Sequence, residues 1–125
     1  MASDHMLFTL EEARALLPEA RARADRIAAG LGQVRAGIDR LAEVAGGNGH
    51  DPDTLDETLS VRSDLEWFRR QGIEIKGFDP LLIDFPHQAG HGVVLLCWRQ
   101  GEEDIDWWHD RDTGFAGRRP LNELG

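Results

Sequence analysis

The sequence contains only one cysteine, Cys97, so no disulfide bond can form within the chain. A single cysteine is typical of proteins that reside in a reducing cytoplasm, and we expect a cytoplasmic location here. Long apolar runs are also absent: none approaches the roughly 18 residues that a transmembrane helix needs, and no signal peptide opens the chain. A membrane is therefore not expected among its partners.

Basic residues are few as well. The chain has 14 of them against 23 acidic residues, and its net charge is −9 at pH 7. This balance repels phosphate backbones on average, so we do not expect nucleic acid as a partner.

The total of 125 residues is enough for one modest hydrophobic core. Residues 1–5 (MASDH) resemble a remnant of an expression vector, with Met6 as the expected natural start. A single domain is therefore predicted over residues 6–125, and His5 is left out of the candidate sites.

A long first helix is predicted from about residue 9 to residue 45. Thr9 and Glu12 have the spacing of a capping box, in which each side chain accepts a hydrogen bond from the backbone of the other. From Leu10 the apolar positions alternate in steps of three and four for five heptads, which indicates a narrow seam like that of a coiled coil. Pro18 lies inside this helix and is expected to kink it, because proline removes one backbone hydrogen bond.

A second helix is predicted from Pro52 to about Gln71, with Gly72 as its stop. The two helices would form an antiparallel hairpin over residues 9–71. Because the second helix is about half as long as the first, part of the seam would have no cover within the chain. We therefore expect a homodimer. The residues expected at the self-association seam are Ile27, Leu31, Val34, Ile38 and Leu41.

After Gly72 the apolar period changes to two, which indicates short strands. The fold class is therefore expected to be α+β: a long antiparallel helical hairpin followed by a small antiparallel sheet of three to four strands, with the sheet and a C-terminal loop over about residues 73–121. The strands are predicted at Ile73–Lys76, Leu81–Phe85, Val93–Arg99 and Asp104–His109.

The last two strands are predicted to form a hairpin around Gly101-Glu102, a two-residue turn with glycine first. This turn pairs Val94 with His109. In that register Cys97 and His109 point to opposite faces of the sheet, so they are not expected to form a Cys–His nucleophile pair.

His109 is the first candidate site residue. It would act as a general base or a metal ligand with help from Asp84 or Asp110, and the alternative is a partly buried histidine held by hydrogen bonds at the rim of the sheet. With His87 and His91, which flank a glycine-containing loop, it would also complete a three-histidine zinc site with one open position. Nothing in the sequence holds the two loop histidines at ligand distance.

Two other segments carry candidate binding groups. Asp104 and Asp106 lie two residues apart and would help to hold a hard cation, or would form a solvated pair partly matched by Arg99. The run Gly114–Arg119 would cradle a small anion with backbone N–H groups and two guanidinium groups. Its alternative is a tight turn in which Phe115 packs into the core and the arginines pair with nearby acidic groups.

Five short motifs follow one another along the chain. They are Leu16-Leu17-Pro18, Asp84-Phe85-Pro86, Cys97-Trp98-Arg99 with Gly101-Glu102, Trp108-His109, and Gly114-Phe115-Ala116-Gly117-Arg118. As a set, from about Leu7 to Leu121, they resemble a prokaryotic family known as domain of unknown function 2203. The resemblance implies a small bacterial protein with no assigned activity and supplies no catalytic residues. It draws attention to Asp84, Trp108, His109 and Arg118.

Two functions of different class follow from these features. The favoured one is a non-enzymatic interaction protein that self-associates through the helical hairpin and needs no cofactor or metal. The alternative is a protein that binds a small anionic ligand or a metal ion, with or without an enzymatic reaction. An acid, an imidazole and a guanidinium suffice to bind an anion and to move a proton. The residues expected to converge at that site are Asp84, His109, Gly114, Gly117 and Arg118.

Overall fold

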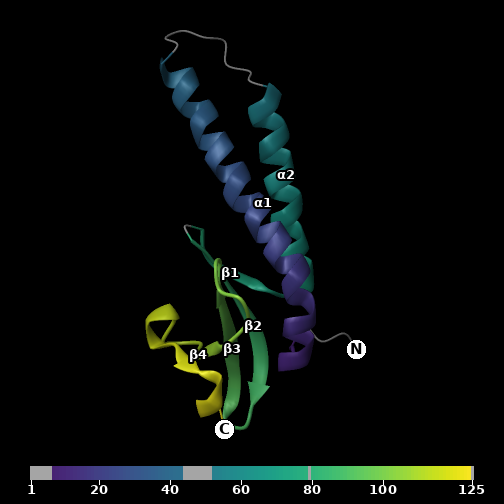
Figure 1. Ribbon diagram of the computed structural model, residues 1–125, viewed down its shortest axis with the longest axis vertical. Helices are drawn as coiled ribbons and strands as arrows, with labels where there is room; N and C mark the ends of the chain where they lie inside the picture. Colours follow the sequence, from purple (N-terminus) through teal and green to yellow (C-terminus); the bar gives the residue numbers. More distant parts are fainter. Residues whose placement is uncertain (1–6, 44–51, 79, 125) are drawn as a thin grey trace.

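The computed structural model describes residues 7–43, 52–78 and 80–124, and it describes side chains outside residues 33–58. Two helices, α1 (Leu10–Glu43) and α2 (Pro52–Gln71), precede a five-stranded antiparallel sheet with the order β1-β2-β3-β4-β5. The helices lie side by side, and the sheet stands against the N-terminal part of α1 (Figure 1). The remaining elements are β1 (Glu74–Phe78), β2 (Leu81–Ala89), β3 (Gly92–Arg99), β4 (Trp107–Asp110), the 3-10 helix η1 (Phe115–Gly117), β5 (Arg119–Pro120) and the 3-10 helix η2 (Leu121–Glu123).

This arrangement is an α+β fold, as predicted, but the sheet has five strands rather than three to four. The fifth strand, β5, is only two residues long and pairs with β4, and its proline gave no strand signal. Within the described residues, no helix combines the length and the apolar character needed to cross a lipid bilayer.

The predicted capping box starts α1. The Thr9 backbone N–H donates to the Glu12 carboxylate at 2.8 Å, and the Glu12 N–H donates to the Thr9 hydroxyl at 3.0 Å. These two bonds satisfy backbone donors that a helix start otherwise leaves without partners. The helix then continues through Pro18 as one uninterrupted element.

The C-terminus of α2 forms a Schellman motif. The Ile73 N–H donates to the Phe68 carbonyl at 3.1 Å, and the Gly72 N–H donates to the Arg69 carbonyl at 3.1 Å. Gly72 has a φ of 80°, a conformation that glycine adopts without steric cost. The predicted helix end is therefore confirmed, and the turn directs the chain into β1.

A buried carboxylate joins the two helices. Asp64 of α2 is 4% exposed, and its Oδ1 accepts hydrogen bonds from Arg23 Nη1 and Arg26 Nη2 of α1, each at 3.0 Å. Charge-assisted bonds of this kind are among the stronger side-chain contacts in proteins. The connection at residues 44–51, which would make the pair the predicted hairpin, lies outside the described residues.

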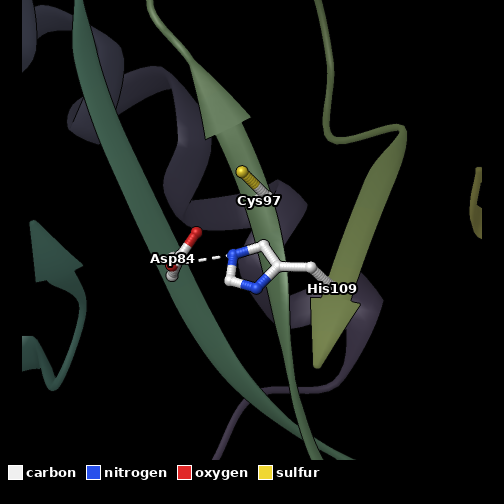
Figure 2. Close-up of side chains that lie close together, drawn as sticks. All are labelled: Asp84, Cys97 and His109. Carbon is white, nitrogen blue, oxygen red and sulfur yellow. Dashed lines mark hydrogen bonds and ion pairs between the residues drawn. The ribbon is translucent and has the colours of Figure 1, made fainter. Parts of the chain in front are cut away.

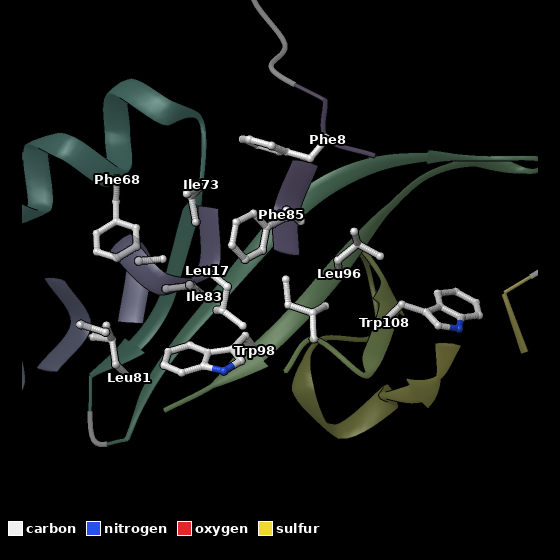
Figure 3. Close-up of a cluster of buried hydrophobic side chains, with 14 of the residues drawn as sticks. Phe8, Leu17, Phe68, Ile73, Leu81, Ile83, Phe85, Leu96, Trp98 and Trp108 are labelled. Carbon is white, nitrogen blue, oxygen red and sulfur yellow. The ribbon is translucent and has the colours of Figure 1, made fainter. Parts of the chain in front are cut away.

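The sheet and α2 together cover the N-terminal half of the α1 seam. Arg14 Nη2 donates to the Ile105 carbonyl at 3.0 Å, and Arg21 donates to the Glu103 carbonyl. Beneath these contacts, apolar side chains of both helices and the sheet meet in one core (Figure 3). This part of the seam is therefore packed within the chain. The seam residues Val34, Ile38 and Leu41 lie among the side chains that are not described. The buried α1 side chains are Ala13, Leu17, Ala20, Ala24 and Ile27.

Strand β2 is longer than predicted, because it continues through Pro86 to Ala89. On the side away from β3, β1 pairs with β2 only as far as Asp84, so Pro86 lies at an edge, where its missing N–H costs no ladder bond. The Phe8 N–H donates to the Pro86 carbonyl at 2.7 Å, and His87 Nδ1 donates to the Phe8 carbonyl at 2.7 Å. The segment before α1 thus covers this edge.

Candidate functional site

The register between β3 and β4 decides which side chains share a face of the sheet. His109 pairs with Leu95 rather than with the predicted Val94, so the predicted register is wrong by one residue. The predicted turn around Gly101-Glu102 is wrong as well: the Glu102 N–H donates to the Arg99 carbonyl at 3.0 Å, so the turn is centred on Gln100-Gly101, with glycine second. The residues after it leave the ladder, and β4 begins only at Trp107. Acidic residues are poor strand formers, which explains why the run after Gly101 does not pair.

This register brings Asp84, Cys97 and His109 together on one face. Asp84 of β2 pairs with Cys97 of β3, and residues that pair directly point to the same side. The expectation that Cys97 and His109 point to opposite faces is therefore wrong. One carboxylate oxygen, the thiol sulfur and one imidazole nitrogen all lie within 4.8 Å of one another, and all three residues are buried. Figure 2 shows the three side chains converging from adjacent strands.

The hydrogen bonds of His109 determine which nitrogen of its ring carries a proton. Its Nδ1 lies 2.7 Å from the Asp110 carbonyl oxygen, which only accepts, so Nδ1 carries a proton and donates it. Its Nε2 lies 3.1 Å from Asp84 Oδ2. In the neutral ring Nε2 therefore presents a lone pair toward Asp84, and in the imidazolium it donates to the carboxylate. His109 contacts both acids that the sequence suggested for it, Asp84 by the side chain and Asp110 by the backbone.

Burial raises the pKa of both other residues of the group, Asp84 and Cys97. Burial raises the pKa of the Asp84 carboxyl, and contacts with His109 and Cys97 only partly offset this effect. Within the described part of the chain, the buried Asp84 Oδ1 has no hydrogen-bond partner. Burial and the nearby charge of Asp84 raise the pKa of the Cys97 thiol to about 12. Burying a carboxylate without a partner for its negative charge costs free energy. A cation bound beside Asp84 would therefore stabilise its ionised form.

A pocket of about 230 Å³ opens over these three residues, on the face of the sheet away from the helices. Lys76 and Arg111 stand beside it, and both bind Glu74, with Lys76 Nζ 2.9 Å and Arg111 Nη2 3.1 Å from its carboxylate. Gly114, with a φ of 63°, and Phe115 contribute the loop that forms one wall. The lining residues are Lys76, Leu82, Asp84, Cys97, His109, Arg111, Gly114 and Phe115.

Arg118 does not join Asp84 and His109 in this pocket. Its Nη2 donates to Glu102 Oε1 at 2.7 Å and to the Cys97 carbonyl at 3.4 Å. Its guanidinium also lies over the ring of Trp107, 5.1 Å from the centroid. The predicted three-residue convergence is therefore wrong for Arg118, which instead holds the backbone of the strand that carries Cys97.

The run Gly114–Arg119 contributes only its first two residues, Gly114 and Phe115, to the pocket. Gly117 is absent from the pocket lining, and a Cβ added there would overlap the side chain of Thr113. The alternative interpretation is confirmed for Arg118, which pairs with an acid. It is wrong for Phe115, which is 36% exposed instead of buried in the core.

The other candidate sites do not assemble in the described part of the chain. His87 binds the Phe8 carbonyl and His91 is exposed, 3.2 Å from Asp110, so the three histidines do not form a zinc site. Among the described residues, the pair Asp104 and Asp106 has one ion-pair partner, an arginine of α1. That arginine is Arg14, 3.3 Å from Asp104 and 3.9 Å from Asp106, in place of the expected Arg99.

Sequence reasoning missed three site residues: Cys97, Lys76 and Arg111. The acidic run Glu102–Asp104 is the only sequence signal that bears on Cys97: it argues for a later start of β4, and this removes the short turn on which the predicted register depends. No comparable signal pointed to Lys76 or Arg111, which lie far apart in the sequence and meet only at Glu74.

Comparison with known proteins adds a family but no activity. Neither the curated proteins nor the solved structures include a match to this chain. A family model described as "Uncharacterized conserved protein (DUF2203)" matches residues 6–121, which is nearly the whole chain. The chain therefore belongs to this family of uncharacterized conserved proteins.

Proposed function

We propose that the protein binds a divalent transition metal ion, with Zn²⁺ as the best fit, through Asp84, Cys97 and His109. The observation that carries this proposal is the convergence of a carboxylate, a thiol and an imidazole from three adjacent strands, with ligand atoms within 4.8 Å of one another. These are the three side-chain types that coordinate Zn²⁺ in proteins. Zn²⁺–ligand bonds of about 2.0–2.3 Å place tetrahedral ligand atoms roughly 3.3–3.6 Å apart, so a closing movement of about 1 Å suffices.

The hydrogen bond at the far side of the His109 ring supports the same proposal. A histidine that binds a metal through one nitrogen usually donates the other N–H to a carbonyl or carboxylate, which sets the tautomer and the ring orientation. His109 Nδ1 donates to the Asp110 carbonyl at 2.7 Å, and this leaves the Nε2 lone pair facing the other two ligands. The backbone of β4 therefore supplies the outer support of the site.

Charge balance provides a third argument. Ionised Asp84 and a Cys97 thiolate carry two negative charges, which the two positive charges of Zn²⁺ neutralise, while His109 is neutral. A neutral complex avoids the cost of a buried unpaired charge. It also gives a partner to the buried Asp84 Oδ1, which has none among the described residues.

The number of ligands favours a reactive site over a purely structural one. Structural Zn²⁺ sites usually have four protein ligands, whereas catalytic sites have three and leave one position open. Asp84, Cys97 and His109 make three, and the pocket of about 230 Å³ gives access to the fourth position. A metal ion in such a position lowers the pKa of a bound water and polarises carbonyl or phosphoryl oxygens.

Metal binding is tested by direct measurement of uptake. The full chain, stripped with a chelator, is titrated with Zn²⁺ in a calorimeter, and with Co²⁺ while the thiolate-to-cobalt absorption is recorded. One ion per chain is expected, with proton release because the thiol must ionise. Asp84→Asn and His109→Gln should each weaken Zn²⁺ binding by more than about 100-fold, because loss of outer-shell support alone costs roughly 10- to 100-fold. Cys97→Ser should also abolish the cobalt–thiolate band.

Matched controls are Asp104→Asn and His91→Gln, which change the same residue types outside the group and should bind as the original chain does. Circular dichroism of every variant checks that the fold is retained. Absence of stoichiometric binding, or equal binding by the Asp84, His109 and control variants, would contradict the proposal and leave Asp84 and His109 as a buried structural pair.

A further inference from the structure

We infer that the metal-bearing pocket takes a small oxyanion, such as a carboxylate or phosphate group, whose charge Lys76 and Arg111 hold at the pocket entrance. This inference rests on the proposed metal site, since one oxygen of the anion takes the open fourth position. It adds a substrate class to that site: compact anionic molecules rather than cations or large apolar ligands.

Two cations placed beside one small pocket carry the inference. Lys76 belongs to β1 and Arg111 follows β4, so they approach from opposite sides of the sheet strands that hold the three metal ligands. Both line the pocket, and both are about half exposed. Together with Glu74, which pairs with both, they leave one net positive charge in a chain whose net charge is −9. Clustered charge of one sign at a cleft attracts ligands of the opposite sign.

Glu74 shows that the two cations already hold a carboxylate between them. Its Oε1 lies 2.9 Å from Lys76 Nζ, and its Oε2 lies 3.1 Å from Arg111 Nη2. Burial of Glu74 raises its pKa, but its contacts with Lys76 and Arg111 outweigh that effect and lower the pKa overall. An incoming oxyanion would therefore compete with Glu74 for the same donors, and Glu74 limits how tightly the pocket binds anions.

Size restricts the ligand further. The pocket of about 230 Å³ is smaller than the roughly 300–1,000 Å³ that drug-sized ligands occupy. Its walls include the apolar side chains of Leu82 and Phe115, and Gly114 contributes only backbone. A molecule of a few heavy atoms fits in this volume. The anionic end of a longer molecule also fits if the rest of that molecule extends into solvent.

The test uses the Co²⁺-loaded full chain, titrated with inorganic phosphate, with acetate and with neutral acetamide, while the visible cobalt bands report changes at the fourth position. Saturable spectral changes are expected with phosphate, acetate or both, and none with acetamide. A response to phosphate alone would assign the ligand to phosphate chemistry, and a response to acetate alone would assign it to carboxylate chemistry.

Three variants separate the pocket cations from the metal. Lys76→Ala and Arg111→Ala should each weaken anion binding by at least about fivefold with unchanged Co²⁺ affinity, and Glu74→Gln should tighten it by a similar factor. Arg62→Ala, which removes an exposed charge on α2, is the matched control and should change neither the anion affinity nor the Co²⁺ affinity. A chain that takes up no Co²⁺ would overturn the metal proposal and this inference together. A cobalt protein that ignores both anions, or binds them equally in all variants, would overturn this inference alone.

Discussion

The Nε2 atom of His109 lies 3.1 Å from Oδ2 of Asp84, and the two side chains are only 3% and 1% exposed. Each residue comes from a different strand, so the sheet and not the local sequence brings them into contact. A carboxylate so deeply buried is stable only if a proton, an imidazolium or a metal ion compensates its charge. The behaviour of this pair with pH therefore reports which of the three is present.

The stability of the metal-free protein should depend on pH through Asp84. Burial raises its folded-state pKa above the ordinary value of 3.8, so its contribution to stability is fully present below that value and is lost as the pH rises through the folded-state pKa. The free energy of unfolding of the original chain should therefore fall, relative to that of Asp84→Asn, as the pH rises from about 4. Urea titrations of both proteins in the presence of a chelator measure this difference.

The same comparison with excess Zn²⁺ serves as the control. Metal binding requires an ionised carboxylate and thiol, so the advantage of the original chain should now grow with pH. A chelated protein whose advantage over Asp84→Asn increases with pH would show instead that the folded state favours the carboxylate form.

The Cys97 thiol should be nearly inert in the folded, metal-free protein. Its pKa of about 12 leaves very little thiolate at pH 8, and only the thiolate is an effective nucleophile. Alkylation by iodoacetamide at pH 8, followed by mass spectrometry, should be at least about 100-fold slower than in the same protein unfolded in urea. Similar rates in the two states would mean that Cys97 is accessible and ionised, contrary to its burial.

Asp64 should contribute strongly to the packing of α2 on α1. Asp64→Ala removes the partner of Arg23 and Arg26, and loss of hydrogen bonds to a charged group typically costs about 1.5–3 kcal/mol. Urea unfolding followed by circular dichroism measures the loss. The control is Glu66→Ala on the same helix, whose pair with Arg69 is exposed and should contribute little. Equal effects of the two variants would show that Asp64 does not join the helices as described.

Self-association through the α1 seam stays a prediction. Part of its basis is gone, because α2 and the sheet together bury the apolar seam side chains of α1 between residues 13 and 27 within the chain. If the seam does form a dimer, Leu31→Glu should convert it to a monomer in native mass spectra, because the charge would lie at the contact. Leu59→Glu on the exposed surface of α2 is the matched control and should leave the subunit number unchanged. A monomeric original chain would contradict the prediction.

Local sequence signals predicted the helices well, because their causes are local. The capping box at Thr9 and Glu12 and the helix stop at Gly72 depend on residues a few positions apart, and both form as expected. The strands were located less well. The sequence predicts a strand that ends at Phe85, yet β2 continues through Pro86, because that edge is covered by Phe8 and not by another strand. That cover comes from the other end of the chain, which no local pattern reveals.

The candidate site, like the fold, was predicted where local sequence decides and missed where contacts between distant segments decide. The sequence identified Asp84 and His109 as residues of interest and placed them together, and they are in contact. It excluded Cys97, because a one-residue change of register moves every side chain of a strand to the other face. It included Arg118, which lies close in sequence to His109 but turns toward Glu102.

The sequence by itself determined the two helices, the change to strands after Gly72 and the ligand-type residues that are available. Hydrogen bonds and apolar periodicity within short windows are sufficient for these features. Only the tertiary structure decided that a carboxylate, a thiol and an imidazole share one buried face under two cations. The physical reason is that strand register depends on how the whole connection after Gly101 packs against α1, where Arg14 and Arg21 hold its carbonyl groups.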